Sequence, residues 1–210
     1  RMDNEHWSVA LHLGSALAFM LSLIWLWLAA ARDRGEQPEW ATFDPVLAAR
    51  WRNRLAWISA ATLFTLFSGA FVSTTAGANT SCGVNGLYDS WPLCHGEFLP
   101  SIHDWVMQSQ VIHRWLVVAV EVALLAASYI IWKEEEGGQC GSTLCKLIWG
   151  ATGLYLVNIG IGASYILSWD MTDGYLEYLS LVHLMLASLT FLVLATAWLG
   201  STIALNERGS

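Results

Sequence analysis

Apolar residues are gathered into five long runs that are separated by shorter polar segments. The runs cover residues 7–31, 55–76, 105–132, 147–168 and 176–204. Each is longer than the roughly 20 residues that a helix needs to cross the hydrocarbon core of a bilayer. None shows the alternation of apolar and polar residues that is typical of a membrane β-strand. The pattern therefore predicts an all-α integral membrane protein with five transmembrane helices.

Composition agrees with this prediction and excludes several other classes. Of the 210 residues, 55% are hydrophobic and 13% are charged, whereas a soluble domain carries about 25% charged residues. The chain has 13 tryptophans, and those near the predicted helix ends are typical of the membrane interface: Trp7, Trp105, Trp132 and Trp169. The net charge of -7 argues against nucleic acid as a partner. A soluble globule, a disordered chain and a nucleic-acid binder are therefore poor descriptions.

Basic residues lie almost entirely on one side of the predicted spans. The two links on that side and the C-terminal tail hold Arg32, Arg34, Arg50, Arg52, Arg54, Lys133, Lys146 and Arg208. Segments 77–104 and 169–175, on the other side, hold none. Since positively charged loops stay inside, we expect the N-terminus and loop 77–104 outside and the C-terminus inside. The first run is longer than a signal-peptide core and has no basic leader, so we expect it to be retained.

The polar segments divide the chain into two parts. Residues 1–54 hold the outer N-terminus, the first transmembrane helix and the basic inner link, and residues 55–210 hold four helices with the outer loop 77–104. A weak internal repeat relates the first helix to the last when His12 is placed over His183. The other matching pairs are Leu13/Leu184, Ala16/Ala187, Leu21/Leu192, Leu23/Leu194, Trp27/Trp198 and Leu28/Leu199. Such a repeat fits a bundle built from two similar halves.

Three histidines lie inside the predicted helices, where an ionisable side chain is a functional candidate by default. His12, His113 and His183 are on three helices that run in the same direction, at a depth of roughly 8–12 Å by helical rise. Two imidazoles from facing helices are the usual axial ligands of a low-spin haem in a helical bundle. The alternative is that each imidazole only bonds to a neighbouring helix. No Cys or carboxylate joins them at ligand spacing, which argues against zinc.

Three further features bear on such a site. Arg114 either pairs with haem propionates, which favour a bidentate guanidinium, or extends to the lipid headgroups. Glu121, two turns deeper, is either protonated, paired across helices or part of a proton relay. The fourth helix is rich in small residues, which favour close helix packing over the close approach of a flat macrocycle. They are Gly150, Gly153, Gly160, Gly162, Ala163 and Ser164.

The four cysteines form two pairs. Cys82 and Cys94 lie in the outer loop with 11 residues between them, so they can close a disulfide in an oxidising compartment. This bond is either a structural staple or a redox-active pair. Cys140 and Cys145 lie on the inner side among Gly and Ser residues, and we expect them to be free thiols.

Three motifs together make the chain resemble the haem A synthase family. They are Trp91-Pro92-Leu93-Cys94-His95-Gly96 in the outer loop, Gln110-Val111-Ile112-His113-Arg114 near the start of the third helix, and Val182-His183-Leu184-Met185-Leu186-Ala187 near the start of the fifth. The resemblance covers about residues 55–204 as the C-terminal, cofactor-haem half. Residues 7–31 resemble the last helix of the N-terminal half.

The resemblance implies a concrete function. That family has two four-helix halves, one holding haem b and the other holding the haem O that is oxidised at a ring methyl to haem A. His113 and His183 would be the axial ligands of haem b, and His12 would be half of the ligand pair of the second haem. The last four helices would then form the haem-binding bundle. The implied setting is the bacterial plasma membrane or the mitochondrial inner membrane, with respiratory oxidase components as further partners.

Two departures from the family pattern change this expectation. The catalytic half carries a Glu three residues before the His of its E-x-x-H-R motif, and here that position is Gln110. The family's cysteine pair is also closer together than Cys82 and Cys94. We therefore expect this chain to bind haem b but to need a second half, or a second chain with E-x-x-H-R, to oxidise haem O. The alternatives are a b-type cytochrome subunit that passes electrons within a respiratory complex, and a structural subunit without haem.

Overall fold

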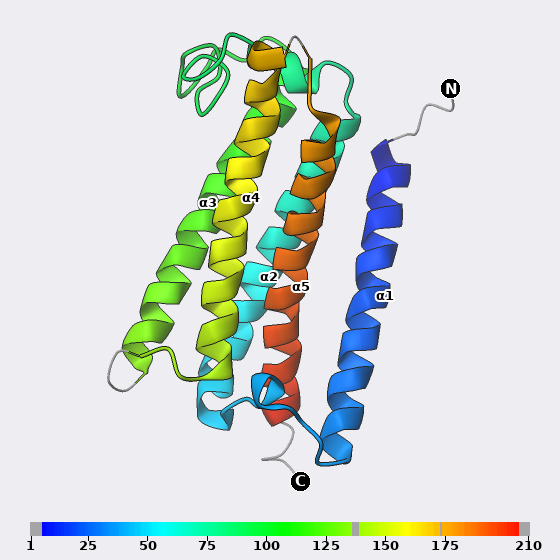
Figure 1. Ribbon diagram of the computed structural model, residues 1–210, viewed down its shortest axis with the longest axis vertical. Coiled ribbons are helices and arrows are strands. Elements are labelled where there is room, and N and C mark those ends of the chain that lie inside the picture. Colours follow the sequence, from blue (N-terminus) through cyan, green and yellow to red (C-terminus); the bar gives the residue numbers. More distant parts are fainter. Residues whose placement is uncertain (1–5, 136–138, 173, 206–210) are drawn as a thin grey trace.

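The computed structural model describes residues 6–135, 139–172 and 174–205, and most of them lie in five long helices (Figure 1). The helices are α1 (His6–Asp33), α2 (Pro45–Thr74), α3 (Trp105–Glu134), α4 (Thr143–Thr172) and α5 (Glu177–Leu205), with short 3-10 helices η1 (Glu39–Ala41) and η2 (Ala78–Thr80). All five long helices are long and apolar enough to cross a membrane. The prediction of an all-α integral membrane protein with five transmembrane helices is confirmed.

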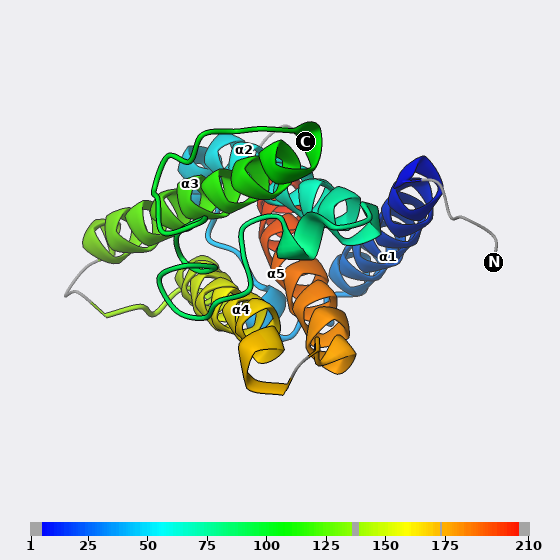
Figure 2. The same cartoon turned by 90° about the horizontal axis from the view of Figure 1, so that it is seen from above.

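Helices α2 to α5 surround a common interior. Each packs against the next in chain order, and α5 closes the ring by packing on α2 (Figure 2). One end of this bundle carries loop 75–104 and the turn between α4 and α5, and it is called the loop end below. The opposite end, the turn end, carries the α1–α2 link and the α3–α4 turn (Figure 1). Near the turn end, Trp51, Leu55, Ile131 and Ile148 belong to one buried cluster that binds α2, α3 and α4 together.

Helix α1 lies outside the ring, against α5 and α2 (Figure 2). Leu17 reaches into the groove between them and packs with Leu66 and Phe191. Only 6% of the most apolar stretch of α1 is buried, against 22% or more in the other four helices. Most of the surface of α1 is therefore open to lipid or to another protein chain.

Helix α2 begins ten residues before the apolar run 55–76, so the predicted start of this span is wrong. Asp44 caps the helix, because its carboxylate accepts the N–H of the third residue after it, and Pro45 fills the first helical position, where no N–H is needed. Trp51 is fully buried and donates its indole N–H to Glu134 at 2.8 Å. Arg50, Arg52 and Arg54 interrupt the apolar pattern of these added turns, so the long apolar run does not reveal them.

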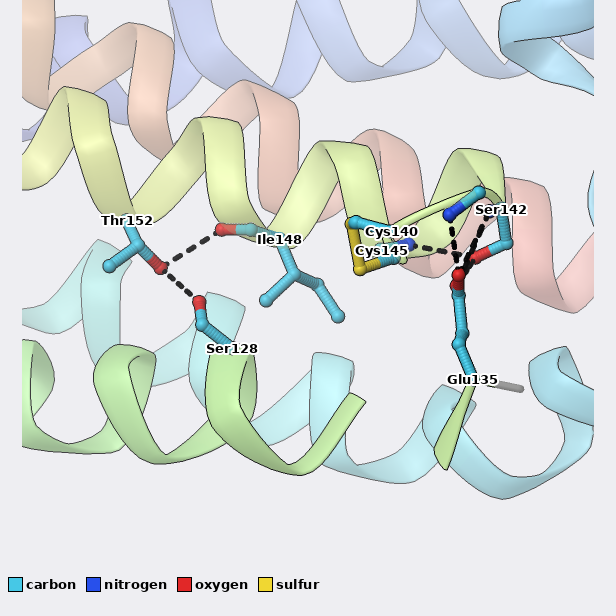
Figure 3. Close-up of a disulfide and its surroundings, with 8 residues drawn as sticks. Ser128, Glu135, Cys140, Ser142, Cys145, Ile148 and Thr152 are labelled. Atoms are coloured by element: carbon cyan, nitrogen blue, oxygen red, sulfur yellow. Dashed lines mark hydrogen bonds between the residues drawn. A yellow bond between two sulfur atoms is a disulfide. The ribbon is translucent and has the colours of Figure 1, made fainter. Parts of the chain in front are cut away.

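The α3–α4 turn holds a disulfide between Cys140 and Cys145, so the prediction of two free thiols is wrong (Figure 3). The carboxylate of Glu135 accepts hydrogen bonds from the N–H of Gly141, at 2.6 Å, and from the N–H and hydroxyl of Ser142. The hydroxyl oxygen of Ser142 accepts the N–H of Cys145. These contacts fold the turn back over the start of α4 and bring the two cysteine Cα atoms to 5.5 Å, within the range of a disulfide.

Candidate functional site

Two of the three predicted histidines meet at the same level of the bundle, near the loop end. His113 lies in the third turn of α3 and His183 in the second turn of α5, and both are half-buried. Their imidazoles are close enough to interact electrostatically. The antiparallel helices α2 and α4 lie between them in the ring, so each histidine has one of these helices as its immediate neighbour.

His183 is held by α4 in a defined tautomer. Its Nδ1 lies 3.0 Å from the backbone oxygen of Asn158. A carbonyl oxygen can only accept, so Nδ1 carries the proton and the Nε2 lone pair is left free. The ring also rests against Gly162: a Cβ built there would come within 2.8 Å of the His183 Cε1. The glycine therefore lets the imidazole approach the α4 backbone.

His113 is held by α2 in the same manner. Its Nδ1 lies 2.8 Å from the Oγ of Ser68, and the Ser68 hydroxyl donates its single hydrogen to the Thr65 carbonyl at 2.7 Å. The serine oxygen is then the acceptor and Nδ1 the donor, which again leaves Nε2 free. A Cβ at Gly69 would come within 2.9 Å of the His113 Cε1. Each histidine thus has an acceptor and a glycine on the helix beside it.

This arrangement suits a haem better than a bare metal ion. Among the residues that the structure describes, no group of three or more His, Cys, Asp or Glu side chains lies close enough to hold a metal ion. Two imidazoles with free Nε2 atoms can complete the coordination of an iron whose other four ligands come from a porphyrin. Acceptors bound to the opposite ring nitrogen are the usual supports of such ligands. The sequence motifs identified His113 and His183 but not their supports Ser68 and Gly69.

Arg114 ties the outer part of α3 to the loop. Its Nη1 donates to the Leu93 carbonyl at 2.6 Å. Its Nη2 is buried and has no hydrogen-bond partner in residues 6–135, 139–172 and 174–205. The guanidinium is therefore held toward the bundle rather than extended freely, and one of its donors remains for an acidic group of a ligand.

The loop that Arg114 contacts is stapled to α3. Cys82 and Cys94 form a disulfide, as predicted. The bond packs on Met107 and Val111, so it covers the first turns of α3 just before His113. Because both cysteines are buried and the bond lies against apolar side chains, its geometry fits a structural staple better than an exposed redox pair.

We expect Cys82 and Cys94, in the outer loop, to resist alkylation in the native protein and to react only after reduction. Intact-protein mass before and after reductant measures this directly. The change Cys82→Ser with Cys94→Ser should loosen the loop, since closing a loop of this size contributes about 3 kcal/mol, and limited proteolysis should then cut within residues 77–104. The double change Cys140→Ser with Cys145→Ser is the matched control, which should leave that loop resistant. Labelling of Cys82 or Cys94 without reductant contradicts the staple.

Tyr175, in the turn between α4 and α5, is a member of this region that the motifs did not identify. Its ring stacks on Tyr165, with the centroids 4.9 Å apart, and lies tilted against the Trp169 ring, with the centroids 4.8 Å apart. Its hydroxyl is buried and has no hydrogen-bond partner in the described part of the chain. Burial, with the neighbouring Tyr165 and Glu177, raises the pKa of Tyr175 to about 12, although Arg114 acts in the opposite direction. Tyr175 is therefore a neutral donor close to a cation.

Tyr175 should ionise near pH 12 rather than at the usual value near 10. The folded pKa exceeds the unfolded one, so the associated stability is complete below pH 10 and is lost as the pH rises toward 12. Tyrosinate absorbance of the wild-type chain minus that of Tyr175→Phe measures the titration. Ionisation of this residue near pH 10 contradicts its burial.

His12 does not join the other two histidines. It lies in the second turn of α1 with its side chain exposed. The face of α1 that contacts the bundle carries Gly14, against Phe67, and Leu17. Phe67 directly precedes Ser68 and Gly69, and Gly14 packs against it, so this part of α1 lies near the level of His113. At helical spacing, however, His12 projects from the face of α1 opposite to Gly14.

Two buried polar residues continue along α3 from this site. Gln110 lies one turn before His113 and is 4% exposed. Glu121 lies about 12 Å deeper by helical rise, and neither of its carboxylate oxygens has a hydrogen-bond partner in the described residues. Further toward the turn end, Ser128 on α3 and Thr152 on α4 pair at 2.8 Å (Figure 3). Within the described part of the chain, Glu121 thus has no hydrogen-bond partner on another helix.

Comparison with known proteins identifies the family of this chain. Residues 1–195 match the model of the family COX15-CtaA, described as cytochrome oxidase assembly protein. The chain is similar to a haem A synthase of Rhodospirillum centenum, at 29% identity over 80% of this chain and 43% of the relative. It is similar to those of Shouchella clausii, at 25% identity over 89% of this chain and 56% of the relative, and of Sphingopyxis alaskensis, at 26% identity over 99% and 54%.

The chain spans about half the length of these curated relatives. No solved structure matches it.

Proposed function

We propose that this chain, which belongs to the COX15-CtaA family of cytochrome oxidase assembly proteins, binds haem b through His113 and His183. We also propose that it takes part in the oxidation of haem O to haem A. Family membership supports a role in haem A biosynthesis. Haem b binding is supported mainly by the two imidazoles, because each has its Nδ1 proton engaged in a hydrogen bond and its Nε2 free. Such a pair is suited to axial ligation.

Each residue of the site has a separate proposed role in haem binding. A haem b bound here would supply one-electron exchange. His113 and His183 would hold the iron from two helices, and Ser68 and the Asn158 carbonyl keep the Nδ1 proton of each imidazole engaged, which leaves Nε2 for the metal. Gly162 allows the ring of His183 to lie against the α4 backbone. Arg114 offers its unpaired Nη2 to a propionate.

The chain is proposed to act with a second half. Its length is about half that of the relatives named haem A synthase. Gln110 cannot exchange a proton as a Glu would, and His12 lies on the exposed face of α1. A partner carrying E-x-x-H-R would supply both the carboxylate and the second ligand for haem O. The same Gln110 supports the second candidate, a b-type cytochrome subunit that only transfers electrons.

The proposed orientation places the loop end outside and the turn end inside. Its support is the charge asymmetry, because Arg52, Arg54 and Lys146 are at the turn end while loop 77–104 has no Lys or Arg. The relatives named above are bacterial proteins, which supports the bacterial plasma membrane as the location.

Expressed alone in cells that supply haem O, the chain should purify with haem b and without haem A. Chromatography of the extracted haem measures this. Haem A should form only when a second chain with E-x-x-H-R is expressed with it, and not when the Glu of that motif is changed to Gln. Haem A made by this chain alone would show that it is a complete enzyme. Haem b without haem A even in the presence of the partner would favour the electron-transfer subunit.

A further inference from the structure

Two buried hydrogen-bond donors lie unpaired beside the histidine layer. They are the Arg114 Nη2 and the Tyr175 hydroxyl, and neither finds an acceptor among the described residues. The two side chains are close enough to interact electrostatically, although they come from α3 and from the α4–α5 turn. A buried donor without an acceptor is costly in a membrane protein, so this pair requires an explanation.

Both donors are fixed in place by other contacts. The Arg114 Nη1 is engaged by the Leu93 carbonyl. The Tyr175 ring is stacked on Tyr165 and lies tilted against Trp169, and Asn79 donates to the Tyr165 hydroxyl at 3.2 Å. The Arg114 Nη2 and the Tyr175 hydroxyl are then the two donors that can bind a ligand. Neither side chain has to be reorganised to receive a ligand.

The chemistry of the two donors selects an anionic acceptor. A guanidinium offers donors only, and a neutral phenol adds another. Glu177 is an electrostatic neighbour of Tyr175, yet it makes no hydrogen bond with the Tyr175 hydroxyl. The acceptor must therefore come from outside the described residues. A carboxylate has two oxygens that can accept from the two donors at once.

We propose that Tyr175 and Arg114 together bind one propionate carboxylate of the haem that His113 and His183 hold, with the Tyr175 hydroxyl and the Arg114 Nη2 as donors. This inference rests on the proposed function, and Arg114 follows His113 directly in α3. Tyr175 is then a binding residue that sets the position of the haem edge. It also links the α4–α5 turn and loop 77–104 to the bound cofactor.

The test compares haem b with haem b dimethyl ester, in which both propionates are blocked. The purified full chain is stripped of haem and titrated with each ligand. The measured quantity is the dissociation constant of the ester divided by that of haem b. A charge-assisted hydrogen bond to a carboxylate predicts that Tyr175→Phe weakens haem b binding by about tenfold and leaves binding of the ester unchanged. Arg114→Gln should reduce the same ratio. Tyr178→Phe, at an exposed tyrosine three residues away, is the matched control and should keep the wild-type ratio.

The ratio of the two dissociation constants distinguishes loss of the propionate contact from general damage to the fold. General damage to the fold weakens binding of both ligands and cancels in the ratio, and Phe retains the stacked ring. If the wild-type chain binds haem b and Tyr175→Phe keeps the wild-type ratio, this inference is overturned and the proposed function stands. If the wild-type chain binds neither ligand, the proposed function and this inference fail together. A lower ratio in Tyr175→Phe and Arg114→Gln, with no change in Tyr178→Phe, supports the shared carboxylate site.

Discussion

Replacing His113 or His183 with alanine is expected to remove the low-spin haem b spectrum. Each change deletes one of the two imidazoles that the bundle presents with a free Nε2. Loss of a group that only supports a metal ligand already costs roughly 10–100-fold in affinity, so loss of the ligand itself should cost at least about 100-fold. The reduced α-band of the purified variant should collapse, and extracted haem per chain should fall with it.

The matched controls for these variants are the loop histidines. His95 and His103 are exposed and lie outside the helices, so His95→Ala and His103→Ala should keep the wild-type spectrum. Helical content by circular dichroism should be equal in all four variants, because His113 and His183 are only half-buried. An α-band that survives in both the His113 and the His183 variant removes these residues as ligands.

Gly162→Ala is expected to lose most of the haem while strengthening the helix. The new Cβ would meet the His183 Cε1 at 2.8 Å and its Nδ1 at 3.0 Å, so the imidazole must leave its place and its bond to the Asn158 carbonyl. Haem retention should fall by about 10–100-fold, as for other changes that displace a ligand's support. The helix itself gains, since alanine is more favourable than glycine by about 1 kcal/mol in a helix interior.

Gly160→Ala provides the control for this prediction. Gly160 lies two residues away on the same helix, and a Cβ there meets no atom within 4 Å. This variant should bind haem as the wild-type chain does. Gly69→Ala should repeat the loss from the side of His113, because its Cβ would lie 2.9 Å from the His113 Cε1. Equal haem content in Gly160→Ala and Gly162→Ala would falsify the proposed close approach.

The sequence predicted the fold well because apolar length alone identifies a membrane span. It failed where polar residues extend a helix or shape a turn. In the first turns of α2, Arg50, Arg52 and Arg54 interrupt the apolar pattern. The start of the helix is therefore marked by its cap at Asp44 and Pro45 and not by an apolar run. The bond between Cys140 and Cys145 depends on the carboxylate of Glu135 folding the turn. Such contacts depend on three-dimensional positions that local patterns do not contain.

The candidate site was predicted in part. Depth along the helices placed His113 and His183 in one layer, and the structure brings them together. Depth does not give direction around a helix, and His12 shares the approximate level but projects from the exposed face of α1. The supports Ser68 and Gly69 are ordinary membrane-helix residues whose role appears only beside His113. Tyr175 lies in a turn without a motif.

The central claim is that this chain holds one haem b between His113 and His183. Electron paramagnetic resonance of the purified, oxidised wild-type chain, quantified against protein concentration, tests it most directly. One low-spin ferric haem per chain is expected, because two imidazoles provide a strong axial field. A high-spin signal, or a purified and folded chain without haem, would contradict it.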